Sequence, residues 1–188
     1  MNVPSVKNIL EAVLFAASES LSIVELQNLF IKVERPSKIQ LKEFIEQLQQ
    51  EYVDKPIELI ETSSGYRFQV KTYYSPWVSR LWEEKPAKYS RAMLETLAII
   101  AYQQPVTRGD IENIRGVAVS SQLVRILLDR KWVRVSGHKD VLGKPALYST
   151  TAEFLDYFNL KTIAELPEMI DLDTAQINRI KQLGEEPQ

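Results

Sequence analysis

The side chain best suited to acid–base chemistry in this sequence is His138, because the chain has one histidine and no cysteine. Imidazole titrates near neutral pH, but a catalytic histidine needs a nucleophile or a carboxylate held beside it. His138 stands in a polar loop next to Lys139 and Asp140, which is typical of a solvated side chain. The sequence shows no phosphate-binding glycine loop, nucleophile elbow or cluster of metal ligands. We therefore predict no catalytic residue, no metal site and no cofactor, and expect a binding protein rather than an enzyme.

Basic side chains are a second group that could bind a ligand, and they concentrate in the middle of the chain. The formal net charge is −2 overall, but it is +5 for residues 87–150 and −5 for residues 151–188. Such side chains could bind the phosphates of DNA, and this binding would be weak, salt-sensitive and independent of base sequence. The residues that could make these contacts are Arg125, Arg134, Lys139 and Lys144. The neighbouring predicted helix has few side chains suited to reading bases, and it carries the acidic Asp129. Sequence-specific recognition of DNA is therefore disfavoured.

A third group of residues occupies two predicted turns and could contact a protein partner. Exposed turns often carry binding residues, and aromatic and arginine side chains dominate interface energies. The candidates are Tyr102, Gln104, Pro105, Arg108, Arg115 and Gly116. A structural interpretation stays open for them, since Pro105 would end a helix, Tyr102 would cover the core and Gly116 would supply a helix end with positive φ.

The elements expected to position these residues are helices followed by a β-hairpin. Sequence signals for this order of elements begin in the N-terminal half. Apolar residues recur at helical spacing over residues 6–17, and capping boxes at Ser22 and Ser37 predict two more helices. Strict alternation on both sides of a Ser-Ser-Gly turn predicts a hairpin over residues 57–70. A further helix is expected over residues 74–84.

The same order of elements is expected a second time. Ser90 can cap a helix whose apolar stripe, Leu94, Leu97, Ala98 and Ala101, would face a core. Thr107 can cap a short helix that Gly116 ends, and a third helix leads into strands at residues 132–135 and 146–149. We predict a mainly α fold with small β-hairpin wings, arranged as two tandem winged-helix domains.

The second set of elements resembles the segregation and condensation protein B family. The resemblance rests on the run from Leu94 to Tyr102 and on shorter segments that follow the family's order and spacing: 104–108, 111–112, 114–117, 137–140, 143–145, 148–151, 154–155 and 166–167. It covers about residues 5–170. Lys131 stands where the family commonly has glycine, Lys144 replaces a common arginine, and Asn159 replaces another common glycine. Asparagine tolerates the left-handed conformation well, whereas Lys131 has no explanation in the sequence.

The resemblance implies an accessory subunit of the bacterial condensin-like complex, which acts in chromosome condensation and segregation. Such a subunit would bind the kleisin (segregation and condensation protein A) as a homodimer, and through it the ATPase of the structural-maintenance-of-chromosomes (SMC) type. The expected domains are residues 1–86 for dimerisation, residues 87–168 for kleisin binding, and an acidic tail at residues 169–188. The expected location is the cytoplasm, in association with the nucleoid.

Large apolar side chains near residue 80 favour a dimer. Trp77, Leu81 and Trp82 exceed what one small domain needs, and aromatic residues are enriched at homodimer interfaces. The alternative is that they cover the first domain or pack against the second. The longest apolar run, residues 97–102, is far short of the roughly 20 residues of a membrane span. The alternative function is a dimeric winged-helix transcription regulator that binds DNA.

Overall fold

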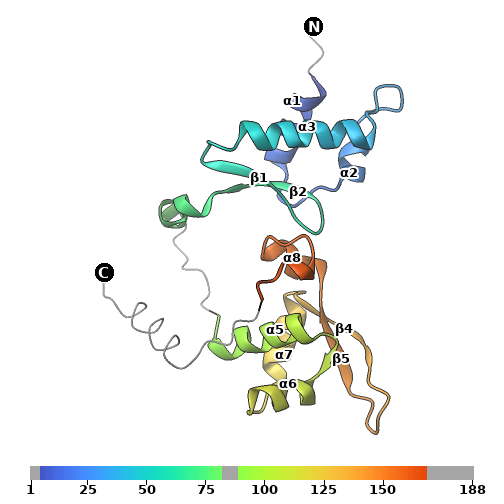
Figure 1. Cartoon of the computed structure of the whole chain (residues 1–188), viewed down its shortest axis with the longest axis vertical. Helices are drawn as coiled ribbons and strands as arrows, with labels where there is room; N and C mark the ends of the chain where they lie inside the picture. Colours follow the sequence, from blue (N-terminus) through green and yellow to red (C-terminus); the bar gives the residue numbers. More distant parts are fainter. Residues whose placement is uncertain (1–4, 82–88, 169–188) are drawn as a thin grey trace.

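The computed structural model of the chain describes residues 5–81 and 89–168, an α-rich arrangement with small antiparallel sheets (Figure 1). The buried apolar side chains of these residues form two separate clusters, one from Leu10 to Tyr66 and one from Met93 to Phe154. The limits predicted for the two domains stay a prediction, and the acidic tail at residues 169–188 lies outside the described residues.

The N-terminal half begins with three helices, α1 (Val6–Ala16), α2 (Ile23–Asn28) and α3 (Lys38–Glu51). Both predicted capping boxes are confirmed: the Ser22 and Ser37 side chains accept backbone N–H groups three residues ahead, and those residues' side chains accept the serine N–H groups. The hairpin is confirmed as well, with β1 (Ile57–Glu61) and β2 (Tyr66–Val70) paired in register from Ile57 opposite Val70.

The helix expected over residues 74–84 is confirmed in part, as helical structure up to Leu81 that is divided into short elements. Residues 72–81 form a 3-10 turn η1 (Thr72–Tyr74), a short helix α4 (Ser75–Val78) and a second 3-10 turn η2 (Ser79–Leu81). None of the three elements contains a buried residue, so no core contact supports a longer helix here. Residues 82–84 lie outside the described part of the chain.

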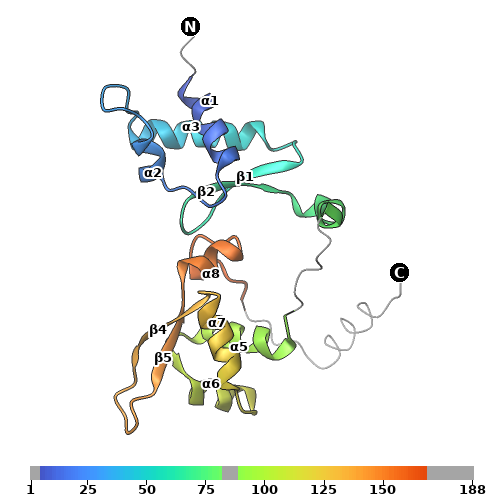
Figure 2. The ribbon, with the colours of Figure 1, turned by 180° about the vertical axis from the view of Figure 1, so that it is seen from behind.

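The C-terminal half repeats the order of helices and hairpin. It contains α5 (Arg91–Gln103), β3 (Val106–Thr107), α6 (Arg108–Arg115), α7 (Ser121–Asp129), β4 (Val133–His138), β5 (Ala146–Thr150), α8 (Ala152–Tyr157) and a 3-10 turn η3 (Ile163–Glu165). The strands form one sheet in the order β3-β5-β4, whose first pairing joins Val106 to Tyr148 and Thr107 to Leu147. Figure 2 shows α8 at one end of the long β4–β5 hairpin and α7 beside the hairpin.

The apolar stripe expected to face the core from α5 is only half right. Leu97 and Ala101 are buried, but Leu94 is 44% exposed and Ala98 is exposed too. The core contacts come from a neighbouring line of residues that includes Met93 and Ile100. The outer line therefore leaves apolar side chains on the surface of the helix.

The hairpin of the N-terminal half contacts the end of α8. The Ser64 backbone N–H donates to Asp156 Oδ1 at 2.9 Å, and the Ser63 N–H donates to the Leu160 carbonyl oxygen at 3.0 Å. Arg67 Nη2 donates to the Asp156 carbonyl oxygen and to Asn159 Oδ1, at 3.0 and 2.7 Å. The contact between the two halves is thus polar and concentrated at one turn.

Three positions at which the sequence departs from the pattern of the family that it resembles have positive φ. Lys131 has φ 57°, Asn159 has φ 57° and Lys144 has φ 39°. A left-handed backbone explains why glycine would be common at 131 and 159, because only glycine adopts it without a Cβ clash. At 131 the chain turns from α7 into β4, and the Lys131 carbonyl oxygen accepts a hydrogen bond from the Thr151 hydroxyl.

We expect Lys131→Gly to stabilise the protein. Removing the left-handed strain of a lysine should raise the free energy of unfolding by about 0.5–1 kcal/mol, measured by urea denaturation. Lys131→Ala is the matched control, because alanine keeps the Cβ and should bring no gain. Equal stability of the glycine and alanine variants would contradict this explanation.

Candidate partner-binding site

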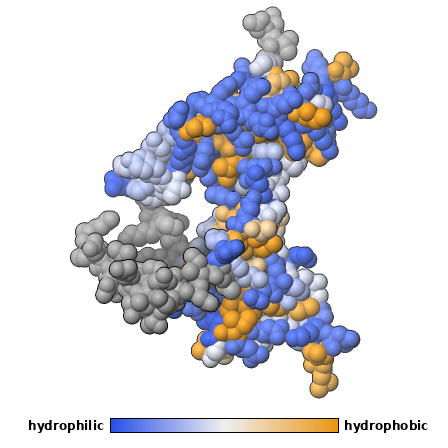
Figure 3. Space-filling model, viewed as in Figure 1, coloured by the Kyte–Doolittle hydropathy of each residue, from blue (hydrophilic) through white to orange (hydrophobic). Residues whose placement is uncertain are grey.

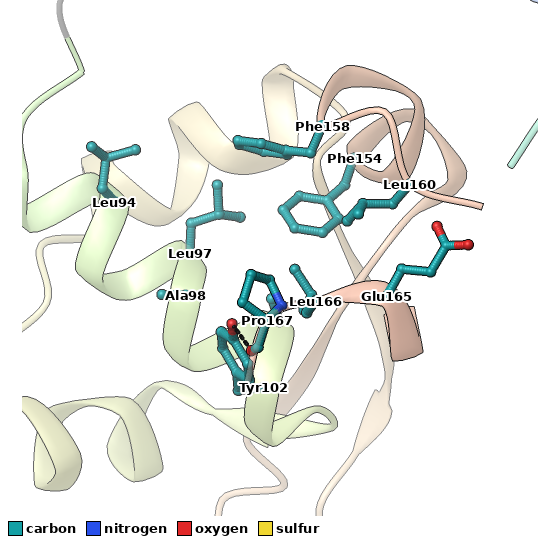
Figure 4. A pocket seen from close by; sticks show the side chains of 11 residues that line it. Leu94, Leu97, Ala98, Tyr102, Phe154, Phe158, Leu160, Glu165, Leu166 and Pro167 are labelled. Atoms are coloured by element: carbon teal, nitrogen blue, oxygen red, sulfur yellow. Dashed lines mark hydrogen bonds between the residues drawn. The ribbon is translucent and has the colours of Figure 1, made fainter. Parts of the chain in front are cut away.

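An open apolar pocket lies between α5, α8 and the segment that follows α8. Its volume is about 430 Å³. Figure 4 shows the side chains that surround it, with Leu94 and Phe158 at one end and Tyr102 and Pro167 at the other. The residues that line it are Leu94, Leu97, Ala98, Ala101, Tyr102, Phe154, Phe158, Leu160, Glu165, Leu166 and Pro167. We call this pocket the α5 groove.

The aromatic wall of the α5 groove is fixed by the start of α8. Thr151 caps that helix, its hydroxyl oxygen accepting the Phe154 N–H at 3.1 Å. The ring centroids of Phe154 and Phe158 are 4.9 Å apart, and those of Trp132 and Phe158 are 5.7 Å apart. Phe154 is buried while Phe158 stays 41% exposed, so one ring anchors the helix and the other lines the groove.

The opposite wall forms because the chain turns back after α8. The left-handed Asn159 ends the helix, and the Leu160 N–H then donates to the Leu155 carbonyl oxygen at 2.8 Å. The segment reaches α5 again at Pro167, whose carbonyl oxygen accepts the Tyr102 hydroxyl at 2.6 Å. Tyr102 thus holds one end of the groove closed.

Tyr102 is the one predicted partner-binding residue that lines the α5 groove. Gln104 instead bonds within the fold, since its Oε1 accepts the Thr150 N–H at 2.8 Å and the Thr150 hydroxyl at 3.0 Å. Pro105, in a cis peptide bond with Gln104, is exposed. Gly116 ends α6 with φ 70°, which confirms its expected role as a helix end.

Two arginines join α6 to its neighbouring helices. Arg108 Nε lies 3.0 Å from Glu112 Oε1 and its Nη1 donates to Ser121 Oγ at 2.8 Å, which ties α6 to the start of α7. Glu112 also accepts the Val119 N–H, and this bond, followed by the Arg108 contact, lowers the pKa of its carboxyl.

Arg115 joins α6 to α5. Arg115 Nη2 lies 3.2 Å from Glu95 Oε2, and the Arg115 side chain is only 9% exposed. Bonds first from Arg91 and then from Arg115 lower the pKa of Glu95.

We expect Arg115→Ala to destabilise the fold. The substitution removes a charge-assisted bond and the packing of a nearly buried stem, which should cost about 1–3 kcal/mol in urea denaturation. Arg91 contacts the same Glu95 carboxylate with an 85% exposed side chain. Arg91→Ala should therefore change stability by less than about 0.5 kcal/mol. Equal losses from the two variants would show that the buried position of Arg115 is unimportant.

The four basic residues named for DNA contact differ in their environment. Lys139 lies 3.2 Å from Asp110 Oδ1, and Arg125 lies 3.9 Å from Asp129 Oδ2. Bonds from the Thr107 backbone and hydroxyl, and then from Lys139, lower the pKa of Asp110 to about 2. Asp110 therefore stays charged at neutral pH and offsets Lys139. Arg134 and Lys144 are exposed.

Apolar side chains are exposed at the end of the N-terminal half. Trp77 is 57% exposed and Leu81 is 76% exposed, and Tyr73, with its ring centroid 6.1 Å from that of Trp77, is 75% exposed. Figure 3 shows further apolar patches scattered over a mostly hydrophilic surface in both halves. Trp82, the third residue named for the dimer interface, lies outside the described residues.

Sequence reasoning missed most of the α5 groove. Phe158, Leu160, Leu166 and Pro167 are close to α5 only because the chain turns back after α8. One signal was present: Leu94 and Ala98 are apolar, although the buried residues of α5 are their neighbours Met93, Leu97, Ile100 and Ala101. An apolar face wider than the core requires is the pattern that indicates such a groove.

The fold and the groove define an α-rich protein with an open apolar surface. Among residues 5–81 and 89–168, no three His, Asp or Glu side chains come together as metal ligands. In the same residues, no helix is long and apolar enough to cross a membrane.

The model of the family described as "Segregation and condensation complex subunit ScpB" matches residues 8–169. The chain belongs to this family.

Two relatives of known name support this assignment. The chain is 49% identical over 181 residues to a "Segregation and condensation protein B homolog" of Coxiella burnetii, covering 95% of this chain and 87% of the relative. It is 41% identical over 172 residues to "Segregation and condensation protein B" of Syntrophotalea carbinolica, covering 90% and 84%. A crystal structure of ScpB from Mycobacterium tuberculosis is 29% identical, covers 85% of this chain and 99% of that one, and superposes with a TM-score of 0.38.

Proposed function

We propose that this protein is a non-enzymatic accessory subunit of the bacterial SMC–kleisin complex, acting in chromosome condensation and segregation. The observation that carries the proposal is the family match over residues 8–169, together with 49% identity to a relative named for segregation and condensation. A subunit of a complex works through its surfaces, which agrees with the apolar α5 groove. Its place of action is the cytoplasm, on the nucleoid.

The proposed architecture is two winged-helix domains in tandem, residues 1–86 and 87–168. Support comes from the repeated order of three helices and an antiparallel hairpin in the described residues. Each half also has a buried apolar cluster of its own. Two small domains joined in this way offer two distinct surfaces, one for a second copy and one for the kleisin.

The α5 groove is the proposed kleisin contact. Its volume of about 430 Å³ and its apolar walls suit the apolar face of a helix or an extended segment. Tyr102 gives it an aromatic anchor with a polar tip. Gln104 and Arg115 then contribute to the site by fixing the helices around it, while Arg108 remains half exposed on α6.

We expect Ala98→Glu to weaken kleisin binding. Ala98 is exposed on α5 and lines the groove, so a carboxylate there would be desolvated by an apolar partner while the helix stays intact. Calorimetry with the kleisin subunit of the same organism should show a loss of about tenfold or more in affinity, on the order of 1.4 kcal/mol.

The matched control for this variant is Ala118→Glu, the same substitution at an exposed alanine that does not line the α5 groove. It should bind as the unmodified protein does. Unchanged affinity in the Ala98 variant would remove the groove from the kleisin site. Loss of binding in both variants would also do so, because the effect would then be one of added charge.

The proposed homodimer uses the exposed apolar residues at the end of the N-terminal half. Tyr73, Trp77 and Leu81 together expose much apolar surface, and such patches mark interaction sites. Aromatic anchors of this kind supply most of the binding energy at interfaces. Trp82 follows directly in the sequence and belongs to the same proposed surface.

We expect the double variant Trp77→Ser, Leu81→Ser to be monomeric. Neither residue is buried in the described chain, so the substitutions should leave the fold unchanged and remove interface area only. Light scattering coupled to gel filtration should report the mass of one chain for the variant and of two for the unmodified protein. Val33→Ser, at a side chain that is 93% exposed, is the control and should remain dimeric. A dimeric double variant would place the interface elsewhere.

A further inference from the structure

The described chain ends at the rim of the α5 groove. Leu166 and Pro167 form part of its wall, and the Tyr102 hydroxyl holds the Pro167 carbonyl oxygen at 2.6 Å (Figure 4). Twenty residues, 169–188, follow Glu168 in the sequence. They begin beside an apolar surface that the described residues leave open.

The sequence of these residues carries an apolar pattern that the proposed function does not use. Ile177, Ile180 and Leu183 recur at a spacing that would share one face of a helix, while Asn178 and Gln182 would lie on the opposite face. A polar tail with no contact to make would not need this pattern. The spacing therefore indicates contact with an apolar surface that these residues can reach.

The α5 groove is within reach. Ile177 lies ten positions after Pro167, and an extended chain of ten residue steps spans up to about 33 Å. The stretch of α5 from Leu94 to Tyr102 rises only about 12 Å. Because the tail is tethered at the rim, its effective concentration is on the order of millimolar, and a weak apolar contact is enough to keep it bound.

We infer that residues 169–188 fold back and place Ile177, Ile180 and Leu183 in the α5 groove. The protein then covers its own apolar surface when no partner is present. Where the groove is also the kleisin contact, which rests on the proposed function, the kleisin must displace the tail to bind. The tail is an intramolecular competitor in that case.

The absence of cysteine from the sequence allows a direct test. The variant Gln182→Cys carries a single thiol on the face opposite the three apolar residues, and a nitroxide spin label is attached to it in the full-length protein. In NMR spectra, the amide signals of Leu94 and Ala98 should lose intensity through proximity to the label. The signal of Ala118, which does not line the groove, should keep its intensity.

Two further samples decide between occupants. Adding Ile177→Ser and Ile180→Ser to the labelled chain should restore the Leu94 and Ala98 signals, whereas adding Asn178→Ser should leave them attenuated. Mixing spin-labelled chain without isotope with isotope-enriched chain without label detects a tail from a second copy. Attenuation confined to that mixture, attenuation that survives the isoleucine changes, or no attenuation at all would each overturn the inference.

Discussion

Burial of one line of residues on α5 is the constraint from which the C-terminal half takes its shape. Met93, Leu97 and Ile100 are almost fully removed from solvent, and each such side chain contributes about 1.5–3 kcal/mol. Because successive helix residues turn by a fixed angle, fixing this inner line also fixes Leu94 and Ala98 on the outside. The groove is thus a consequence of how the core is built, with α8 supplying the second wall.

Much of the fold followed from local signals in the sequence. The capping boxes at Ser22 and Ser37 and the hairpin over residues 57–70 depend on neighbours within a few positions, and the structure has them where they were expected. The helix predicted over residues 74–84 depended instead on a core contact that does not form in the described residues. The sequence did not predict the two-residue strand β3, because only its pairing with β5 defines it as a strand.

The candidate site was less accessible to sequence reasoning. Aromatic and arginine residues in turns were expected to face a partner, yet Arg115 is nearly buried against Glu95 and Gln104 is bonded to Thr150. Both distances along the chain are long, so neither bond leaves a local pattern. The conformation of Lys131 was equally hidden, since a single unusual φ angle is set by the turn between α7 and β4 rather than by the residue type.

Helix α8 is shared between two contacts. One of its sides supplies Phe154 and Phe158 to the groove, while Asp156 and the residues after it receive the bonds from Ser64 and Arg67 of the N-terminal half. Thermodynamic linkage makes such an arrangement reciprocal. An occupant that shifts α8 must work against the bonds to the hairpin, and loss of those bonds must change the affinity of that occupant by the same factor.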